Sequence, residues 1–156
     1  GRMQEVASKK NGAKIFVDFA HTPDALESVL KSIRSHFIGK IHLIFGAGGN
    51  RDIGKRAIMG KIASKLSDNV IITDDNPRFE KPSTIRSQIM KFCPNATEIA
   101  DRSEAILTGV NQLKNGDALI IAGKGHENFQ IYGNNEYPFN DSEEASFAIE
   151  ALGEKL

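Results

Sequence analysis

Short runs of apolar residues alternate along the chain with stretches in which apolar residues recur every three or four positions. The apolar runs are rich in branched side chains and are bounded by Gly, Asp or Asn, which is typical of strands. Because their apolar residues are consecutive rather than alternating, both faces of these strands should be covered, as in parallel sheets. We therefore predict strands at residues 15–17, 41–45, 70–72 and 119–122, and a weaker strand at 97–99.

The intervening stretches have the periodicity of amphipathic helices. The first begins after Thr22 and Pro23, a capping threonine followed by proline at the first helical position. In all of them the apolar residues keep the three- and four-residue spacing of a helix that buries one face. These residues are Ala25, Leu26, Val29, Leu30 and Ile33 in the first helix, Ile58, Ile62 and Leu66 in the second, Ile85, Ile89 and Phe92 in the third, and Ile106 and Val110 in the fourth, which runs from about residue 101 to 113.

The C-terminal part of the chain has a different pattern. Residues 130–132 and 136–138 flank a Gly-Asn-Asn turn, which predicts a β-hairpin. A last helix should follow Asp141, with Glu144 completing a capping box. The alternation of strands and helices predicts an α/β fold, a Rossmann-like doubly wound, mainly parallel sheet with helices on both faces and an antiparallel C-terminal edge hairpin. We expect residues 1–156 to form a single domain.

The composition restricts the classes of function without selecting one. The 156 residues include 20 basic and 20 acidic side chains, and 40% are hydrophobic, as in a globular domain. Without net charge, the chain offers no field that would favour nucleic acid or an anionic membrane as a partner. No apolar run reaches the roughly 18 to 20 residues that cross a bilayer. The first residues do not resemble a secretory signal and the single cysteine, Cys93, fits a reducing compartment, so we expect a cytoplasmic protein.

Several loops with polar or glycine-rich sequences are predicted to meet at one edge of the sheet. In a doubly wound sheet, ligands bind at the carboxyl ends of the strands. Four of the predicted loops leave those ends, and together they hold most of the unusual chemistry of the chain. We therefore expect a single ligand site there, formed by residues 18–23, 46–52, 73–78 and 123–127.

The loop at residues 46–52 permits two interpretations. Its first two glycines resemble part of a dinucleotide-binding motif, but Arg51 occupies the position of the third glycine. The cations Arg51, Lys55 and Arg56 near a helix N-terminus favour an anion instead, with the glycines letting a ligand approach the backbone. A solvated basic loop in which Arg51 pairs with Asp52 is the alternative to an anion site.

The loop at residues 74–78 contains two acids, an amide and an arginine around a proline. Arginine binds a carboxylate through two parallel hydrogen bonds, which lysine cannot do, so this loop suits a zwitterion. The paired acids Asp74 and Asp75 also suggest a metal, but no cluster with metal-ligand spacing accompanies them. We therefore predict no metal ligands in this chain.

Two histidines, His21 and His126, are predicted to lie in loops at the same edge. Either could be a metal ligand or an acid and base, but a hydrogen-bonding role is the more ordinary one. His36 and His42 are expected to be structural. The Gly-Lys-Gly-His run that starts at residue 123 lacks the spacing and the Ser or Thr of a Walker phosphate loop.

Taken together and in this order, the loop sequences resemble the C-terminal domain of the Mur ligase family. Asp-Asn-Pro-Arg is the most specific element; in this family it is associated with meso-diaminopimelate, whereas lysine-adding relatives carry another residue in place of Arg78. The resemblance covers the whole chain. It is carried by Gly-Arg-Met at the start, Val-Asp-Phe-Ala-His-Thr-Pro-Asp-Ala-Leu at residues 17–26, Gly-Gly-Asn-Arg-Asp at 48–52, Asp-Asn-Pro-Arg-Phe-Glu at 75–80 and Gly-Lys-Gly-His-Glu at 123–127.

The resemblance implies an ATP-dependent ligase that adds meso-2,6-diaminopimelate to UDP-N-acetylmuramoyl-L-alanyl-D-glutamate in peptidoglycan synthesis, with ATP as co-substrate and Mg2+. It also implies that residues 1–156 are a recognition domain, inactive alone, and that other domains bind the UDP-sugar and ATP. By the same resemblance, Arg2, Asp18 and His21 reach ATP when the enzyme closes. The residues that it implies for binding the diamino acid are Arg51, Asp75, Asn76, Pro77, Arg78, Gly123 and Glu127.

Two alternatives remain open from the sequence. One is another ligase of the superfamily, such as the L-lysine-adding, D-Ala-D-Ala-adding or folylpolyglutamate-forming enzymes, although Arg78 argues against the first of these. The other is a non-catalytic module that binds a nucleotide or an amino acid. Residues 1–156 contain no phosphate loop of the Gly-Thr-Asn-Gly-Lys-Thr type, so catalysis would require a further domain.

Overall fold

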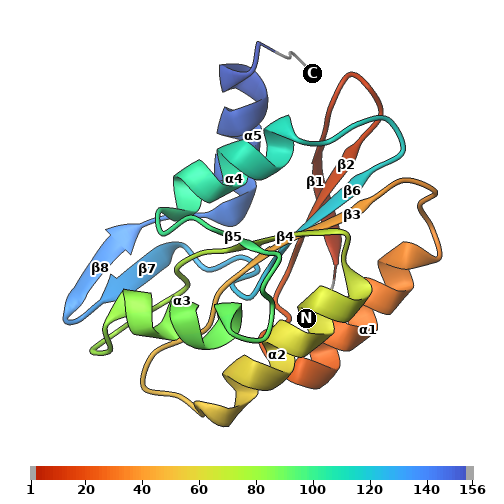
Figure 1. Cartoon of the computed structure of the whole chain (residues 1–156). Helices are drawn as coiled ribbons and strands as arrows, with labels where there is room; N and C mark the ends of the chain where they lie inside the picture. The colour runs from red at the N-terminus through yellow and green to blue at the C-terminus, as the bar shows by residue number, and fades with distance from the viewer. Residues whose placement is uncertain (1–2, 154–156) are drawn as a thin grey trace.

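A six-stranded sheet forms the centre of the computed structural model, which describes residues 3–153 (Figure 1). The strand order is β1-β2-β6-β3-β4-β5, and only β1 runs antiparallel to its neighbour. A hairpin of two further strands forms a separate small sheet. The strands are β1 (Gln4–Ser8), β2 (Lys14–Asp18), β3 (Ile41–Phe45), β4 (Asn69–Ile72), β5 (Thr97–Glu98), β6 (Ala118–Ala122), β7 (Phe129–Tyr132) and β8 (Asn135–Pro138).

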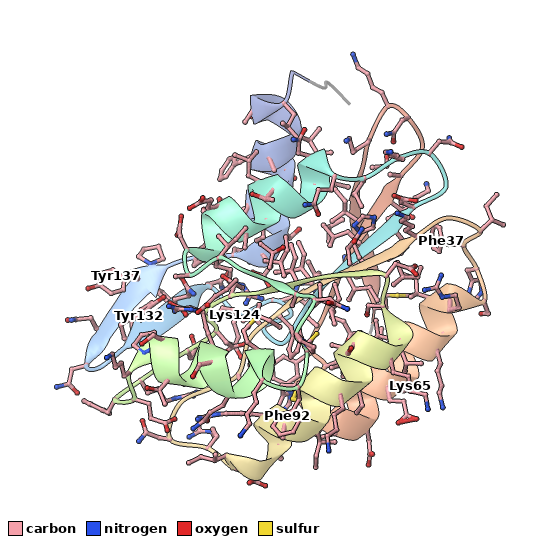
Figure 2. All side chains as sticks on the ribbon, in the orientation of Figure 1. Phe37, Lys65, Phe92, Lys124, Tyr132 and Tyr137 are labelled. Carbon is pink, nitrogen blue, oxygen red and sulfur yellow. The ribbon has the colours of Figure 1, made fainter. Side chains whose placement is uncertain are left out.

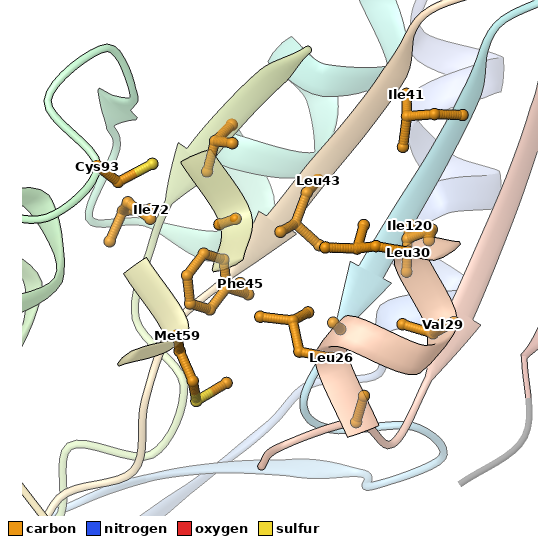
Figure 3. Close-up of a cluster of buried hydrophobic side chains, with 14 of the residues drawn as sticks. Leu26, Val29, Leu30, Ile41, Leu43, Phe45, Met59, Ile72, Cys93 and Ile120 are labelled. Carbon is orange, nitrogen blue, oxygen red and sulfur yellow. The ribbon is translucent and has the colours of Figure 1, made fainter. Parts of the chain in front are cut away.

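Helices cover both faces of the large sheet, as the sequence pattern predicts. Side chains of alternate strand residues point to opposite faces. Along β3, Leu43 and Phe45 pack among residues of α1, α2 and α3, whereas Ile44 between them packs among residues of α4 and α5. Figure 3 shows the first of these two cores. The helices are α1 (Pro23–Arg34), α2 (Gly54–Leu66), α3 (Pro82–Met90), α4 (Arg102–Asn111) and α5 (Asp141–Ala151).

The predicted element types are confirmed for all the parallel strands and for the first four helices. At the start of α1, the Thr22 hydroxyl accepts a hydrogen bond from the Ala25 N–H at 3.3 Å, and Pro23 is the first helical residue. Four side chains of α1, namely Leu26, Val29, Leu30 and Ile33, are buried, as the spacing predicted.

The predicted antiparallel edge of the sheet lies at the other end of the chain. The hairpin of β7 and β8 exists, but it pairs with itself instead of extending the large sheet. The antiparallel edge strand is β1, which no apolar pattern marked because Ala7 is its only buried residue. An edge strand needs few apolar side chains, since backbone pairing with β2 holds it in place.

Two helix details also differ from the sequence predictions. In α2, Ile62 and Leu66 pack against the core as predicted, but Ile58 is 49% exposed, and Met59, Gly60 and Ala63 are buried on the face that packs on the domain. A side chain on Gly60 would place its Cβ 2.7 Å from the Ile89 carbonyl oxygen, so a small residue is required where α2 meets α3. Small residues such as Gly60 and Ala63 add little to an apolar periodicity, which explains why Ile58 was wrongly assigned to the buried face.

At the start of α5, the capping residue is Asn140 rather than Asp141. The Asn140 side chain accepts a hydrogen bond from the Glu143 N–H at 3.0 Å, and Asp141 is the first helical residue. Asp141 is fully buried and forms a bidentate ion pair with Arg102, at 2.7 and 2.8 Å. Burial alone would lower the pKa of Arg102, but the adjacent Asp141 carboxylate raises it, so Arg102 stays charged.

The Arg102 guanidinium also binds the main chain at the ends of two strands. Its nitrogens donate to the carbonyl oxygen of Asp74, just after β4, at 3.1 Å and to that of Ala122, the last residue of β6, at 3.2 Å. One buried cation therefore connects α4, α5 and the two strand ends from which two of the predicted site loops depart.

We predict that Asp141→Asn lowers the free energy of unfolding by about 3–5 kcal/mol, because it leaves the buried Arg102 charge without a counter-charge. Urea unfolding followed by circular dichroism measures the effect. The matched control is Glu150→Gln, which neutralises an exposed acid on the same helix and should change stability by less than about 0.5 kcal/mol. Equal stability of the two variants would contradict the structural role of the pair.

Candidate functional site

Residues from the loops after β2, β3, β4 and β6 line one cavity of about 280 Å³ at the carboxyl ends of the strands. The predicted convergence of these loops is therefore observed. Six of the seven residues predicted for the diamino acid line this cavity, and so does His21 from the predicted nucleotide group. The six are Arg51, Asp75, Asn76, Arg78, Gly123 and Glu127.

Backbone contact between two loops sets the shape of this cavity. The Gly49 N–H donates to the Asn76 carbonyl oxygen at 2.8 Å, and a Cβ on Gly49 would lie 1.7 Å from the Pro77 carbonyl oxygen. A Cβ on Gly46 would lie 2.1 Å from the Thr73 carbonyl oxygen. Gly46 and Gly49 therefore allow this loop to pack against the next loop. Gly46 and Gly48 also line the cavity, so the approach of a ligand to this backbone stays a prediction.

Arg78 is held at the cavity in a backbone conformation that non-glycine residues rarely adopt, with φ of 53°. Its Nη1 donates to the carbonyl oxygens of Gly49, at 3.1 Å, and Asn76, at 3.3 Å, and its backbone N–H donates to Ile131 of β7. Among the described residues, the Nε and Nη2 atoms of Arg78 have no hydrogen-bond partner. The guanidinium is thus fixed at one nitrogen and retains donors for a ligand carboxylate.

Asp75 contributes a buried carboxylate to the cavity, with only 8% of the residue exposed. No described residue donates a hydrogen bond to this carboxylate. Burial raises its pKa, the charges of Arg102 and Lys124 oppose the rise, and the negative charge of Glu127 adds to it. An acid in such a place gains from a cationic ligand, because the ligand supplies the missing partner.

The neighbouring acid, Asp74, faces away from the cavity and does not form a paired-carboxylate site with Asp75. Its two oxygens accept hydrogen bonds from Arg86 Nη1 at 2.5 Å and from the Tyr132 hydroxyl at 2.8 Å. Burial, followed by the hydrogen bond to the Asp74 carboxylate, raises the pKa of Tyr132, which stays a hydroxyl donor. Within residues 3–153, no group of three His, Cys, Asp or Glu side chains is arranged to hold a metal ion.

Only part of the basic sequence at the start of α2 is available to a ligand. Arg56 is buried and its Nη2 forms an ion pair with Glu80 at 2.5 Å, which lowers the pKa of the Glu80 carboxyl. The predicted anion site of three cations is therefore wrong for Arg56, whose charge is neutralised within the domain. All three cations border the cavity, but only Arg51 and Lys55 are accessible there, and Arg51 is exposed.

The residues predicted to reach ATP have different environments. Asp18 is buried, and one of its oxygens accepts from the Ala20 N–H at 2.7 Å, so it shapes the loop after β2. His21 is exposed, donates from Nδ1 to the Phe19 carbonyl oxygen at 2.8 Å and packs edge-on against the Phe19 ring. Arg2 lies outside the described residues. Pro77 is buried and contacts Gly49 through its backbone rather than lining the cavity.

The other three histidines lie in different environments, and one lysine near the cavity is buried. His42 is buried between Asp117 and Asn69, as a structural residue would be, and His36 binds Ser32 within its own turn. His126 is exposed and lines a second hollow beside the cavity. Sequence reasoning named Lys124 only as an ion-pair partner of Glu127, the alternative to a ligand contact of that acid. The structure contains this pair, at 3.2 Å, and Lys124 is fully buried, which its glycine-rich loop did not indicate.

Fold and cavity define a class of protein: an α/β ligand-binding domain whose site, at the carboxyl ends of parallel strands, contains free guanidinium donors and free carboxylate oxygens together. A family model described as "Mur ligase, glutamate ligase domain" matches residues 1–125. The chain therefore belongs to the Mur ligase family. No helix among residues 3–153 is both long and apolar enough to span a membrane.

Two relatives and one solved structure that resemble the chain carry the same name. The chain is 53% identical over 151 residues to a UDP-N-acetylmuramoyl-L-alanyl-D-glutamate–2,6-diaminopimelate ligase of Brucella melitensis, covering 97% of the chain and 31% of the relative. It is 55% identical over 148 residues to the ligase of that name from Rickettsia typhi, covering 92% of the chain and 29% of the relative. A solved structure with the same name superposes with a TM-score of 0.91 at 40% identity, over 99% of this chain and 32% of that one. The chain thus spans about a third of the length of these relatives.

Since burial raises the pKa of Asp75, ionisation of this group costs stability. This cost in folding free energy is absent when the pH is well below 3.8, the ordinary pKa of aspartate. It grows as the pH rises through the higher pKa that Asp75 has in the folded state. We therefore expect Asp75→Asn to melt at a higher temperature than the parent at pH 7, with the difference shrinking toward pH 4. Thermal unfolding at several pH values, with the exposed-site control Glu136→Gln, measures this. A lower melting temperature of Asp75→Asn at pH 7 would contradict it.

Proposed function

We propose that this chain is the C-terminal recognition domain of an ATP-dependent ligase that adds meso-2,6-diaminopimelate to UDP-N-acetylmuramoyl-L-alanyl-D-glutamate. The names of the relatives at 53–55% identity support the proposal. The observation that carries it is the presence in one cavity of Arg78, with free guanidinium donors, and of Glu127, with a free carboxylate oxygen. One end of diaminopimelate is an α-amino acid that needs both groups, whereas the corresponding end of lysine has only an ammonium.

The site geometry supports the following roles within this proposal. Arg78, with Arg51 nearby on the cavity lining, would bind the distal carboxylate of the diamino acid. Glu127 and Asp75 would receive the distal ammonium, and the positive φ of Gly123, 115°, lets its backbone pass beside Asp75, since a Cβ there would lie 2.8 Å from the Asp75 carboxylate. The amine at the other end of the ligand would be left to react.

Further domains would supply the rest of the reaction. In the ligation, ATP phosphorylates the γ-carboxylate of the D-glutamate, and the free amine then displaces phosphate from the acyl phosphate to form the amide. We propose that Arg2, Asp18 and His21 face ATP across a cleft that closes between domains. His21 lines the cavity, which supports a position beside the ligand. The residues described here do not fit Mg2+, and we assign none of them to it.

A ligation assay with the complete polypeptide tests the proposal. With ATP and the UDP-muramoyl dipeptide, product measured by mass spectrometry should form with meso-diaminopimelate and only poorly with L-lysine. Equal use of lysine would favour a lysine-adding enzyme. Binding of diaminopimelate without any ligation would favour the non-catalytic module.

We predict that Arg78→Ala reduces kcat/KM for meso-diaminopimelate by roughly ten- to several-hundred-fold, from the loss of charge-assisted hydrogen bonds worth about 1.5–3 kcal/mol. The weak use of lysine should change little, because lysine has no distal carboxylate. The matched control is Arg34→Ala, which removes an exposed arginine paired with Asp68. Equal losses for both amino acids would show that Arg78 only supports the loops through Gly49 and Asn76.

Glu127→Gln should reduce kcat/KM for meso-diaminopimelate about thirtyfold, or roughly 2 kcal/mol, because the carboxylate that meets the ammonium becomes neutral. The glutamine oxygen would turn toward Lys124 and its amide N–H toward the ligand ammonium, which is repulsive. The KM values for ATP and for the UDP-muramoyl dipeptide should stay nearly constant. Unchanged diaminopimelate kinetics would show that Glu127 pairs with Lys124 and does not bind the ligand.

A further inference from the structure

Lys124 is a buried cation whose ammonium contacts Asn76 and Glu127, two of the residues proposed to bind the diamino acid. Lys124 is fully inaccessible to solvent. Nζ donates to Asn76 Oδ1 at 2.9 Å, to Glu127 Oε1 at 3.2 Å and to the Phe129 carbonyl oxygen at 2.7 Å. In Figure 2, Lys124 lies in the middle of the molecule, beside the hairpin strand that begins at Phe129. With three donors and three acceptors, the ammonium is fully satisfied.

The contacts of Asn76 fix the direction of its amide group. Oδ1 receives the Lys124 ammonium and the Ile131 backbone N–H at 3.0 Å, two groups that can only donate. The oxygen of Asn76 must therefore point toward Lys124, and Nδ2 must point the other way. One Nδ2 hydrogen is donated to Glu127 Oε1 at 3.2 Å. Since Asn76 lines the cavity, the second hydrogen is left for a ligand acceptor.

The contacts of Glu127 divide its carboxylate in a similar way. Oε1 accepts from both Lys124 and Asn76, while Oε2 has no partner among the described residues. The side chain is 40% exposed and lines the cavity. One oxygen is therefore anchored, and the other stays available to a ligand donor.

We propose that Lys124 is a positioning residue that decides which atoms of Asn76 and Glu127 face the ligand. It turns an N–H of Asn76 toward a carboxylate and holds an anionic oxygen of Glu127 toward an ammonium. The inference rests on the proposed function, because it assigns the orientation of the α-amino acid group at the distal end of the diamino acid. Lys124 itself does not touch the ligand.

Kinetics of Lys124→Met in the complete ligase test this role. The KM for meso-diaminopimelate should rise about thirtyfold, in the range expected when charge-assisted hydrogen bonds are lost, while the KM values for ATP and the UDP-muramoyl dipeptide stay within about twofold. The control Lys114→Met removes an exposed lysine and should leave all three values unchanged. A uniform loss of kcat with constant KM values would mean that Lys124 is only structural, which overturns the inference.

The pH dependence separates positioning from packing. The charges of Arg102, Lys124, Glu127 and Asp141 all act on the buried Asp75 carboxyl, and Lys124 is one of the two cations that lower its pKa. Without Lys124, Asp75 should ionise at higher pH, so the acidic limb of kcat/KM for diaminopimelate should shift upward. An unshifted acidic limb would count against the inference, because a change in packing alone does not remove a charge that acts on Asp75.

Asn76→Asp provides a second test that does not depend on the folding of Lys124→Met. The variant keeps an oxygen for Lys124 and Ile131 but replaces the N–H at the cavity by a second oxygen. If Lys124 sets the direction of the amide, this substitution should weaken diaminopimelate use by about thirtyfold or more, since a donor becomes a repelling anion. Kinetics within twofold of the parent would show that the Asn76 oxygen already faced the ligand, and would overturn the inference. A parent enzyme that does not ligate diaminopimelate would refute the proposed function instead.

Discussion

The guanidinium of Arg102 lies where four separate segments of the chain meet, and the geometry of the binding cavity depends on it. It pairs with Asp141 at the start of α5 and binds the main chain at Asp74 and Ala122. Each of these two carbonyl groups belongs to the residue just before one that lines the cavity, Asp75 or Gly123. A buried ion pair adds little net stability, but it fixes geometry, since removing either partner leaves an uncompensated charge.

The charged groups at the cavity fall into a buried set that supports the loops and a partly exposed set that is proposed to bind the ligand. Arg102 and Lys124 are wholly buried and have all their partners within the domain, whereas Arg78 and Glu127 are partly exposed and each keep unpaired donors or acceptors. Asp75 is the exception, because it is buried without a hydrogen-bonding partner and has a raised pKa. Groups of this kind are typical of binding sites, where part of the folding stability is given up in favour of the ligand.

The sequence predicted the fold and the location of the site because both depend on local signals. Apolar runs marked the parallel strands, Thr22 marked a helix start, and polar loops at the strand ends marked the cavity. The sequence did not predict features that depend on tertiary partners. Both Asp74 and Asp75 follow the same strand, yet only contact with Arg86 and Tyr132 turns Asp74 away. The burial of Arg56 and Lys124 depends on Glu80 and on Asn76, which are distant from them in sequence.

The mixture of charges in the cavity has a consequence for the kinetics of association. The chain carries no net charge, and a zwitterionic amino acid group carries none either. Long-range attraction between the two is therefore weak, and capture should proceed at an ordinary diffusional rate with little dependence on ionic strength. For the proposed diamino acid, discrimination then arises after contact, when both charges of its distal end are paired at once. Selectivity in such a site is expressed as residence time rather than as speed of encounter.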